Sequence, residues 1–191
     1  MKSVIAGVDE AGRGPLAGPV TVAAVILNKQ IDGLNDSKKL SEKKRFELEP
    51  LILENSMAWS VVHIDIETIE EINILHASLL GMQKAVNKLL VQPDKILVDG
   101  NKCPEYSIPA EAIVGGDGKI AEISAASILA KNARDRLMLE IHQEFPNYGF
   151  DKHKGYGTKL HLQQLIKYGP CRHHRKTFAP VQKLLQMEMF K

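Results

Sequence analysis

Four acidic residues lie where short apolar stretches or turns end. Asp9 and Glu10 end the first such stretch. Asp99 ends the stretch KILVD, and Asp117 lies in a glycine turn before a long helical segment. Four carboxylates in one pocket repel one another unless cations neutralise them, and hard oxygen ligands select Mg²⁺ or Mn²⁺. Such a site suits two-metal hydrolysis of a phosphodiester, but the same residues are also ordinary turn formers, so spacing alone leaves both interpretations open.

A glycine-flanked arginine, Gly12-Arg13-Gly14, follows the acidic pair directly. Such an element brings backbone N–H groups and a guanidinium close to a phosphate or ribose. With Ala17 it also matches the relaxed dinucleotide fingerprint GxGxx(G/A). That fingerprint works only where its last position opens a helix, and the β-branched run at 19–28 predicts a strand instead. A nucleotide-dependent oxidoreductase is therefore disfavoured.

Charge is divided unevenly along the chain. Residues 152–191 carry nine Lys or Arg and one acid, Glu188, a net charge of +8, so the remainder of this chain of formal charge +2 carries −6. A basic surface beside an acidic body fits a polyanion, although a solvated lysine-rich helix gives the same count. Within this segment Tyr156 stands between two glycines, where it can stack on a sugar or base or simply pack the loop.

Length and composition are those of one globular domain, with 191 residues, 44% hydrophobic and 25% charged. Apolar stretches fall far short of the roughly 20 residues that a membrane helix needs. Because the N-terminal stretch lacks the pattern of a secretory signal, we expect a cytoplasmic protein. Cys103 and Cys171 form no CxxC pair, so we expect free thiols.

Apolar periodicity predicts the elements that must position these residues. Strands are predicted at 3–9, 19–28, 57–65, 95–99 and 113–118. Helices are predicted after an N-cap at Ser41 with Pro50 bending or interrupting the helix, at 66–90 as one helix or two abutting ones, at 120–145, at 159–168 and from about Pro180. Residues 148–158 are predicted as a glycine-broken loop. This order predicts an α/β fold, a mixed sheet covered by helices.

Six short motifs occur in a particular order along the chain. They are GVDEAGRGPLAGPV at 7–20, NDSKKLS at 35–41, LVDGN at 97–101, GGD at 115–117, ISAASILAKNARD at 123–135 and HKGYGT at 153–158. Together they resemble the bacterial ribonuclease HII family, a type 2 RNase H. The resemblance implies one catalytic domain over 1–191, with an RNase H-like mixed sheet flanked by helices in 1–150 and a basic C-terminal helical region in 151–191.

The resemblance assigns the acids a role. Asp9, Glu10, Asp99 and Asp117 fall on the four catalytic acids of the family, which hold two Mg²⁺ or Mn²⁺ ions. The related HIII branch carries an extra N-terminal domain and usually a Glu as its fourth acid. Here eight residues precede Asp9 and the fourth acid is Asp117, which favours the HII branch.

The resemblance also assigns substrate contacts. Gly12, Arg13 and Gly14 fall on the family's GRG element, which contacts the 2′-hydroxyl of the ribonucleotide and adjacent phosphates. Tyr156 falls on the tyrosine that stacks beneath the sugar next to the cleaved junction. Lys38 resembles a nucleic-acid contact near the site.

The implied activity is an endoribonuclease that hydrolyses the RNA strand of RNA/DNA hybrids. It would also nick 5′ of single ribonucleotides in duplex DNA, leaving 5′-phosphate and 3′-hydroxyl ends, as ribonucleotide excision repair and DNA replication require. A four-acid 3′-to-5′ exonuclease and a non-catalytic hybrid-binding protein are the alternatives. We expect a monomer that binds no membrane. Contact with a replication clamp or polymerase is left open, because the C-terminal QKLLQMEMF fits either a partner motif or a packed last helix.

Overall fold

A mixed five-stranded sheet forms the centre of the computed structural model, which describes residues 3–34 and 40–189, with side chains as far as 187. The strands lie in the order β3-β2-β1-β4-β5. Their bounds are β1 (Ile5–Ala11), β2 (Val20–Leu27), β3 (Ser56–Ile64), β4 (Lys95–Asp99) and β5 (Ala110–Ile113). β1 pairs antiparallel with β2 and parallel with β4, so the central strand joins the two halves of the sheet.

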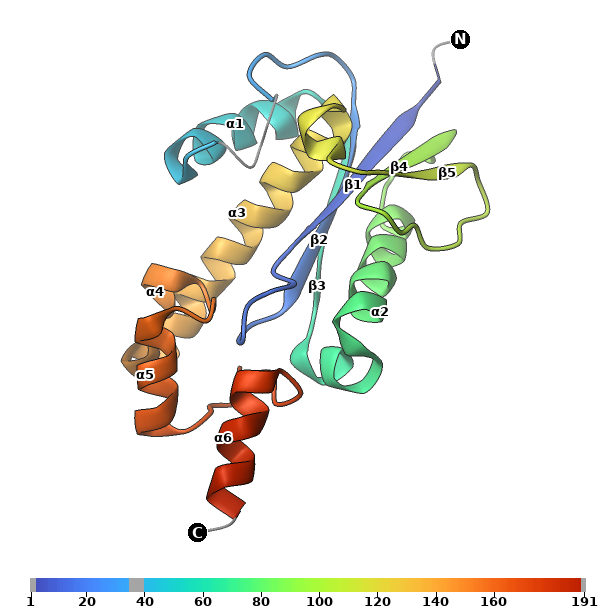
Figure 1. The fold of residues 1–191 in the computed structure, drawn as a ribbon. Helices are drawn as coiled ribbons and strands as arrows, with labels where there is room; N and C mark the ends of the chain where they lie inside the picture. The colour runs from blue at the N-terminus through green and yellow to red at the C-terminus, as the bar shows by residue number, and fades with distance from the viewer. Residues whose placement is uncertain (1–2, 35–39, 190–191) are drawn as a thin grey trace.

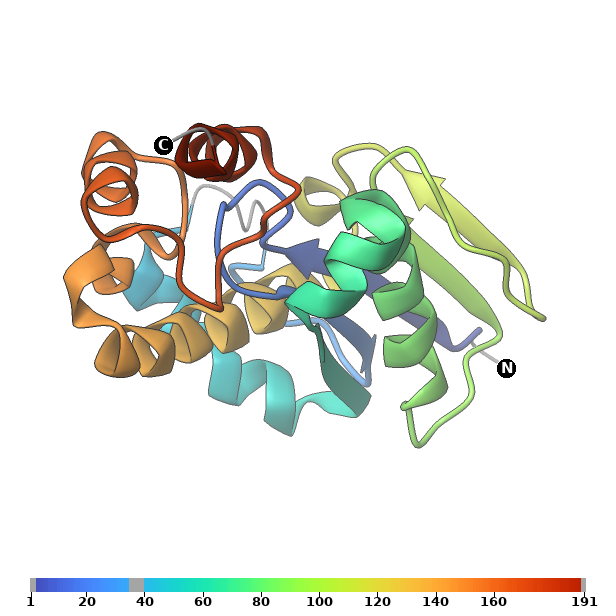
Figure 2. The same cartoon turned by 90° about the horizontal axis from the view of Figure 1, so that it is seen from below.

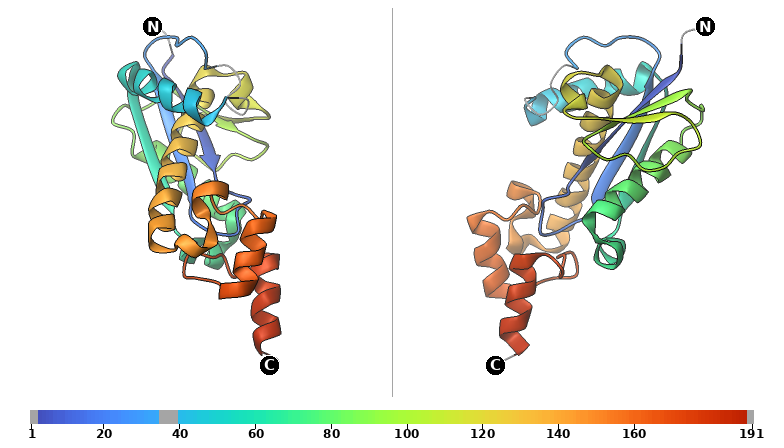
Figure 3. Two further views of the ribbon diagram at one scale, coloured as in Figure 1. Left: turned by 90° about the vertical axis from the view of Figure 1, so that its left-hand side faces the viewer. Right: turned by 45° about the vertical axis from the view of Figure 1, so that its right-hand side comes forward.

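Helices cover both faces of this sheet (Figure 1). They are α1 (Glu42–Glu54), α2 (Ile66–Asn87), α3 (Ala121–Glu144), α4 (Phe150–His153), α5 (Lys159–Tyr168) and α6 (Ala179–Met189). α2 packs on one face, and α3 with α1 packs on the other. Figures 2 and 3 show α4, α5 and α6 gathered at one end of the molecule, beside the loop that joins β1 to β2. The α/β fold with a mixed sheet, flanking helices and C-terminal helices confirms the predicted class.

α3 lies unusually close to β1. A Cβ atom added at Gly7 would stand 2.1 Å from the backbone carbon of Glu122 and 2.2 Å from the nitrogen of Ile123. The small residues Ser124, Ala125 and Ala126 follow on the same helix and are buried. Small side chains on the helix and a glycine on the strand together let the two backbones approach.

α2 is two abutting helical segments that meet at Asn73. This residue has φ 63° and ψ 165°, which no helical residue adopts. Its side-chain oxygen accepts hydrogen bonds from the N–H groups of Leu75 and His76, at 3.0 and 3.2 Å. Asn73 therefore caps the second segment, and of the two alternatives that the sequence left open, the structure shows two abutting helices.

Three predicted elements differ from the structure. α1 continues past Pro50 to Glu54, so Pro50 does not interrupt the helix, and Leu48 and Ile52 on either side of it are both buried against α3. β5 occupies 110–113 rather than 113–118, and the glycine turn after it forms the short 3₁₀ helix η2 (Gly116–Gly118). The predicted loop 148–158 contains α4, preceded by the 3₁₀ turn η3 (Pro146–Tyr148).

Replacing Gly7 with Ala should destabilise the fold, because the new methyl group meets the α3 backbone, which cannot move aside without separating helix from sheet. We expect a loss of about 3 kcal/mol or more in the free energy of unfolding, measured by urea denaturation. Gly118→Ala is the matched control, since nothing lies within 4 Å of its added Cβ. Equal stability of the two variants would contradict the close approach of α3.

Candidate active site

The parallel register of β1 and β4 places two of the predicted acids side by side. The last registered pair of this ladder is Val8 with Val98. Asp9 and Asp99 are the next residues on each strand, at the carboxyl ends where the two strands separate. Registered neighbours in a sheet point to the same face, so these two carboxylates face the same space.

β1 continues beyond this point, to Ala11, along β2 alone. Asp9 is in register with Ala23, which packs toward α3, and Glu10 is in register with Val22, which packs toward α2. The two acids therefore leave the strand on opposite faces. Both nevertheless line one cavity of about 380 Å³, because β4 has ended and no longer separates the faces. The sequence predicted that β1 would end at Asp9, and this is wrong by two residues.

The carboxyl groups in this cavity are electrostatically coupled. Burial raises the pKa of Asp9 well above its ordinary value, and the charges of Glu10 and Asp99 raise it further. Burial also raises the pKa of Glu10, against the opposing effect of Arg13, whose Nη1 lies 3.2 Å from the Glu10 Oε1 atom. Asp9 accepts hydrogen bonds from the N–H of Glu10, at 2.7 Å, and from Ser127 on α3. The site thus concentrates more negative charge than its own hydrogen bonds compensate.

Asp117 lies next to this group on η2. The Asp99 Oδ1 atom accepts a hydrogen bond from the N–H of Gly116, at 2.7 Å, and lies 3.4 Å from the N–H of Asp117. Asp117 is only 4% exposed. It is not among the residues that line the 380 Å³ cavity, so the structure brings three acids into the cavity and holds the fourth next to Asp99.

The acid group fits a divalent cation by its chemistry. Glu10 Oε2 is buried without a hydrogen-bond partner, a costly condition that a cation would relieve. Carboxylate oxygens are the ligands that Mg²⁺ and Mn²⁺ prefer. Within the described ranges, no three His, Cys, Asp or Glu side chains already stand in the arrangement of a metal site. Binding an ion would therefore require these carboxylates to turn toward one another.

The loop between β1 and β2 also lines the cavity, through Gly12, Arg13 and Gly14. Two buried arginines hold this loop through its carbonyl oxygens. Arg175 donates to the carbonyls of Gly12, Arg13, Pro15 and Gly18, at 2.6 to 2.9 Å. The predicted binding element is thus bound by a residue that lies 162 positions beyond Arg13 in the sequence.

Arg134 of α3 holds the same loop from the other side. It donates to the carbonyls of Ala17, Pro19 and Lys154, at 3.0 to 3.2 Å. Burial lowers the pKa of Arg134 to about 10. Burial, together with the nearby charge of Arg134, lowers the pKa of Arg175 to about 9. Both guanidinium groups are therefore charged at neutral pH, and backbone dipoles rather than acids supply most of their hydrogen bonds.

Tyr156 lies against the same cavity and is 43% exposed. Its ring stands 5.8 Å from Lys131 Nζ and 5.9 Å from the guanidinium carbon of Arg134. A Cβ added at Gly14 would lie 3.8 Å from the Tyr156 ring, so the ring borders the glycine-flanked arginine. The structure therefore brings Tyr156 together with the predicted GRG element and the acids.

Sequence reasoning missed three further residues of this cavity, Arg45, Ser127 and Lys131. Ser127 and Lys131 lie on α3 four residues apart, and Arg134 follows three residues later, so one helix face carries all three. Their presence in the ISAASILAKNARD motif was the available signal. Lys38, the remaining predicted contact, lies outside the described residues.

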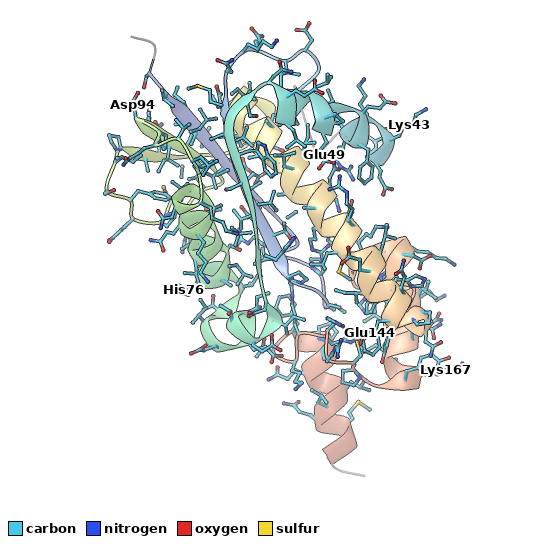
Figure 4. The ribbon with its side chains drawn as sticks, turned by 180° about the vertical axis from the view of Figure 1, so that it is seen from behind. Lys43, Glu49, His76, Asp94, Glu144 and Lys167 are labelled. Carbon is cyan, nitrogen blue, oxygen red and sulfur yellow. The ribbon has the colours of Figure 1, made fainter. Side chains whose placement is uncertain are left out.

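An ion-pair network fixes α1, and with it Arg45, on α3. Asp135 is buried and accepts from Arg45 at 3.0 Å and from Lys131 at 2.8 Å. Asn132 donates to the Glu49 carboxylate, and Figure 4 shows Glu49 on the side of α1 next to α3. Two cations are thereby held at the edge of the acid-lined cavity. A second, larger cavity of about 600 Å³ lies between α2 and the segment 105–108, away from every predicted site residue.

Comparisons with known proteins show what this chain is similar to. The family model "Ribonuclease HII" matches residues 6–181. The chain is 58% identical over 184 residues to the ribonuclease HII of Idiomarina loihiensis, covering 95% of this chain and 98% of that protein. The solved structure of ribonuclease H2 from Pyrococcus horikoshii OT3 superimposes with a TM-score of 0.82 at 26% identity, over 98% of this chain and 99% of that one. The RNase HII in a PCNA complex from Archaeoglobus fulgidus gives 0.77 at 25% identity, over 92% and 95%.

Asp9→Asn should stabilise the metal-free protein at neutral pH. The folded-state pKa of Asp9 lies above its unfolded value, so the folded state binds the proton more tightly, and the free energy of unfolding falls as pH rises through that interval. Removing the charge should raise the free energy of unfolding at pH 7 by about 1 kcal/mol or more, measured by urea denaturation in a chelator. The gain should vanish below pH 4.

The exposed Asp32 supplies the control, since Asp32→Asn removes a carboxylate that lies in solvent. A loss of stability in Asp9→Asn at pH 7 would contradict the proposed charge repulsion in the cavity.

Proposed function

This chain belongs to the ribonuclease HII family and is an endoribonuclease of RNA/DNA hybrids, and we propose that cleavage takes place at the acids where β1 and β4 separate. One observation carries this proposal. Asp9 and Asp99 follow the last registered pair of the ladder, and the unpaired Oε2 atom of Glu10 lies buried in the same cavity, which the GRG element also lines. Negative charge beside a loop suited to binding phosphate fits metal-assisted phosphodiester hydrolysis.

The four acids Asp9, Glu10, Asp99 and Asp117 would hold two divalent ions, Mg²⁺ or Mn²⁺. When bound, such ions supply an activated water and stabilise the leaving oxygen. Ser127 holds the Asp9 carboxylate in place. Arg13 pairs with Glu10 in the substrate-free protein, and a substrate phosphate would compete for that guanidinium.

The GRG element would read the 2′-hydroxyl, the group that distinguishes RNA from DNA. Because Arg175 occupies the carbonyls of Gly12 and Arg13, the loop presents N–H donors to a ribose oxygen and to the adjacent phosphates. Tyr156 would stack beneath the neighbouring sugar, with Lys131 close enough to bind a phosphate. Lys38 remains a proposed contact. Because the GRG element would recognise the 2′-hydroxyl of only one nucleotide, a single ribonucleotide in duplex DNA would suffice for nicking on its 5′ side.

Partners and location are proposed more coarsely. The RNase HII of Archaeoglobus fulgidus is described in complex with PCNA, so we propose contact with a replication clamp for this chain as well. Met187 on α6 is exposed and apolar, which suits such a contact. Along the part of the chain that the structure describes, no helix is long and apolar enough to cross a membrane. Both cysteines are free, and a monomer in the cytoplasm remains our expectation.

A closed circular duplex that contains one ribonucleotide tests the function most directly. The wild-type protein should nick it with Mg²⁺ or Mn²⁺ and leave 5′-phosphate and 3′-hydroxyl ends, as mapped by primer extension and end labelling. Asp9→Asn should lower the nicking rate by a factor of about a thousand or more, while hybrid affinity changes little. A requirement for a free end would favour the four-acid exonuclease, and full activity in Asp9→Asn would refute the site.

Divalent ions should also stabilise the protein without any substrate. Millimolar Mg²⁺ or Mn²⁺ relieves the carboxylate repulsion, so we expect the melting temperature to rise by several degrees. The shift should be largely lost in Asp99→Asn, measured by differential scanning fluorimetry. Ca²⁺ and Na⁺ at equal ionic strength separate specific binding from screening. An identical shift in the variant and the wild type would place the ions elsewhere.

A further inference from the structure

Two buried histidines join the backbone of Cys171 to that of Tyr156 in one chain of hydrogen bonds. The N–H of Cys171 lies 3.0 Å from His174 Nδ1. The Nε2 atoms of His174 and His161 stand 3.0 Å apart, and His161 Nδ1 lies 2.9 Å from the carbonyl oxygen of Tyr156. The ends of the chain determine its direction, because a backbone N–H can only donate and a carbonyl can only accept.

The direction of the chain selects one tautomer for each ring. His174 Nδ1 accepts from Cys171, so its proton sits on Nε2 and is donated to His161. His161 Nε2 accepts that bond, and its own proton sits on Nδ1 and is donated to Tyr156. Both rings are fully buried, and burial lowers the pKa of each to about 4, so both are neutral at physiological pH.

The segment that carries His174 is also bound to the loop of the GRG element. The N–H of Gly18 donates to the carbonyl of His173 at 2.9 Å, and the N–H of Arg175 donates to the carbonyl of Leu16 at 2.8 Å. Ala17 and His174 form a bridge between these two segments. The histidine chain therefore spans from the back of this loop to Tyr156.

Hydrogen bonds also hold the backbone of Tyr156, at the other end of the histidine chain. Its N–H donates to the carbonyl of His153, and its carbonyl accepts a second bond, from the N–H of Thr158 at 2.8 Å. Leu16 N–H donates to the carbonyl of Gly155, where a Cβ would stand 2.5 Å from the Ala17 oxygen. Tyr156 and the GRG loop are thus parts of one hydrogen-bonded unit, and the His161 contact is its only side-chain bond to the Tyr156 backbone within the described ranges.

We propose that His161, oriented by His174, is a positioning residue that sets the distance between the Tyr156 ring and the GRG element, and thereby the preference for single ribonucleotides. This inference rests on the substrate contacts proposed above. A single 2′-hydroxyl can be bound in only one position along the strand, so displacement of the Tyr156 ring loses the whole stacking interaction at that position. In an RNA tract, neighbouring 2′-hydroxyls offer other registers, and the same displacement costs less.

Long-range ¹H–¹⁵N NMR at pH 7 tests the chain in the wild-type protein, so it does not depend on any variant folding. We expect His161 to be protonated on Nδ1 and His174 on Nε2. The opposite tautomer on either ring would overturn the inference, because the chain could then not run from Cys171 to Tyr156.

Kinetics test the consequence, through the ratio of kcat/KM on a duplex with one ribonucleotide to kcat/KM on an RNA-tract hybrid. His161→Leu removes the donor to Tyr156 and should lower this ratio about tenfold. His161→Asn is the matched rescue, because its amide N–H₂ can replace Nδ1–H as donor, and it should keep the ratio within about twofold. Thermal unfolding of both variants checks that they fold. An unchanged ratio in folded His161→Leu would overturn the inference.

Tyr156→Ala separates this inference from the proposed function. If Tyr156 stacks on the sugar, its removal lowers the ratio, and adding His161→Leu to it lowers the ratio no further. A further fall in the double variant would show that His161 acts elsewhere and would overturn the inference alone. An unchanged ratio in Tyr156→Ala itself would refute the proposed role of Tyr156, and the inference with it.

Discussion

Two buried guanidinium groups organise the substrate side of this molecule. Arg134 and Arg175 together bind seven backbone carbonyls, six of them in the loop between β1 and β2. A buried charge without hydrogen bonds is very costly, so the arginines require the loop in this conformation as much as the loop requires them. The GRG element, Tyr156 and the C-terminal helices all meet at these two side chains. Their mutual dependence gives a glycine-rich loop, otherwise a flexible element, a single shape before substrate arrives.

This arrangement changes the meaning of the basic C-terminal segment. The net charge of +8 in residues 152–191 fits either a surface for a polyanion or a solvated lysine-rich helix. Arg175 is one of those charges, yet it is fully buried and donates its hydrogen bonds to backbone carbonyls of the protein. His161 and His174 in the same segment are buried and neutral. Part of this segment therefore builds the site from within, and only its exposed lysines and arginines are available to a nucleic acid.

Elements with a clear apolar period could be predicted from the sequence, and residues whose partners are distant could not. The bounds of β4 and α5 follow directly from local patterns and caps, whereas the apolar period of α2 left open whether it is one helix or two. The continuation of α1 through Pro50 could not be predicted, because the destabilising effect of a proline is visible in the local sequence. The burial of Leu48 and Ile52 that offsets it depends on tertiary packing. The four acids stand out by their place at strand ends and turns, but only the resemblance to ribonuclease HII assigned them a role, which remains a proposal. The roles of Arg134, Arg175 and the histidine chain depend on backbone carbonyls, which carry no residue-specific signal in a sequence.

One helix, α3, contacts both the acids of the cavity and the loop that carries the GRG element. Ser127 holds Asp9, Lys131 lies by the Tyr156 ring, and Arg134 binds the GRG loop, all from one helix face. The acids it supports destabilise one another, since burial and mutual charge both raise the pKa of Asp9. The loop between β1 and β2, which α3 also supports and which is proposed to recognise the substrate, is instead held by many hydrogen bonds. Electrostatic repulsion is thus confined to the carboxylates that cations are proposed to neutralise. The close approach of α3 to Gly7 fixes the position of the acids relative to this loop.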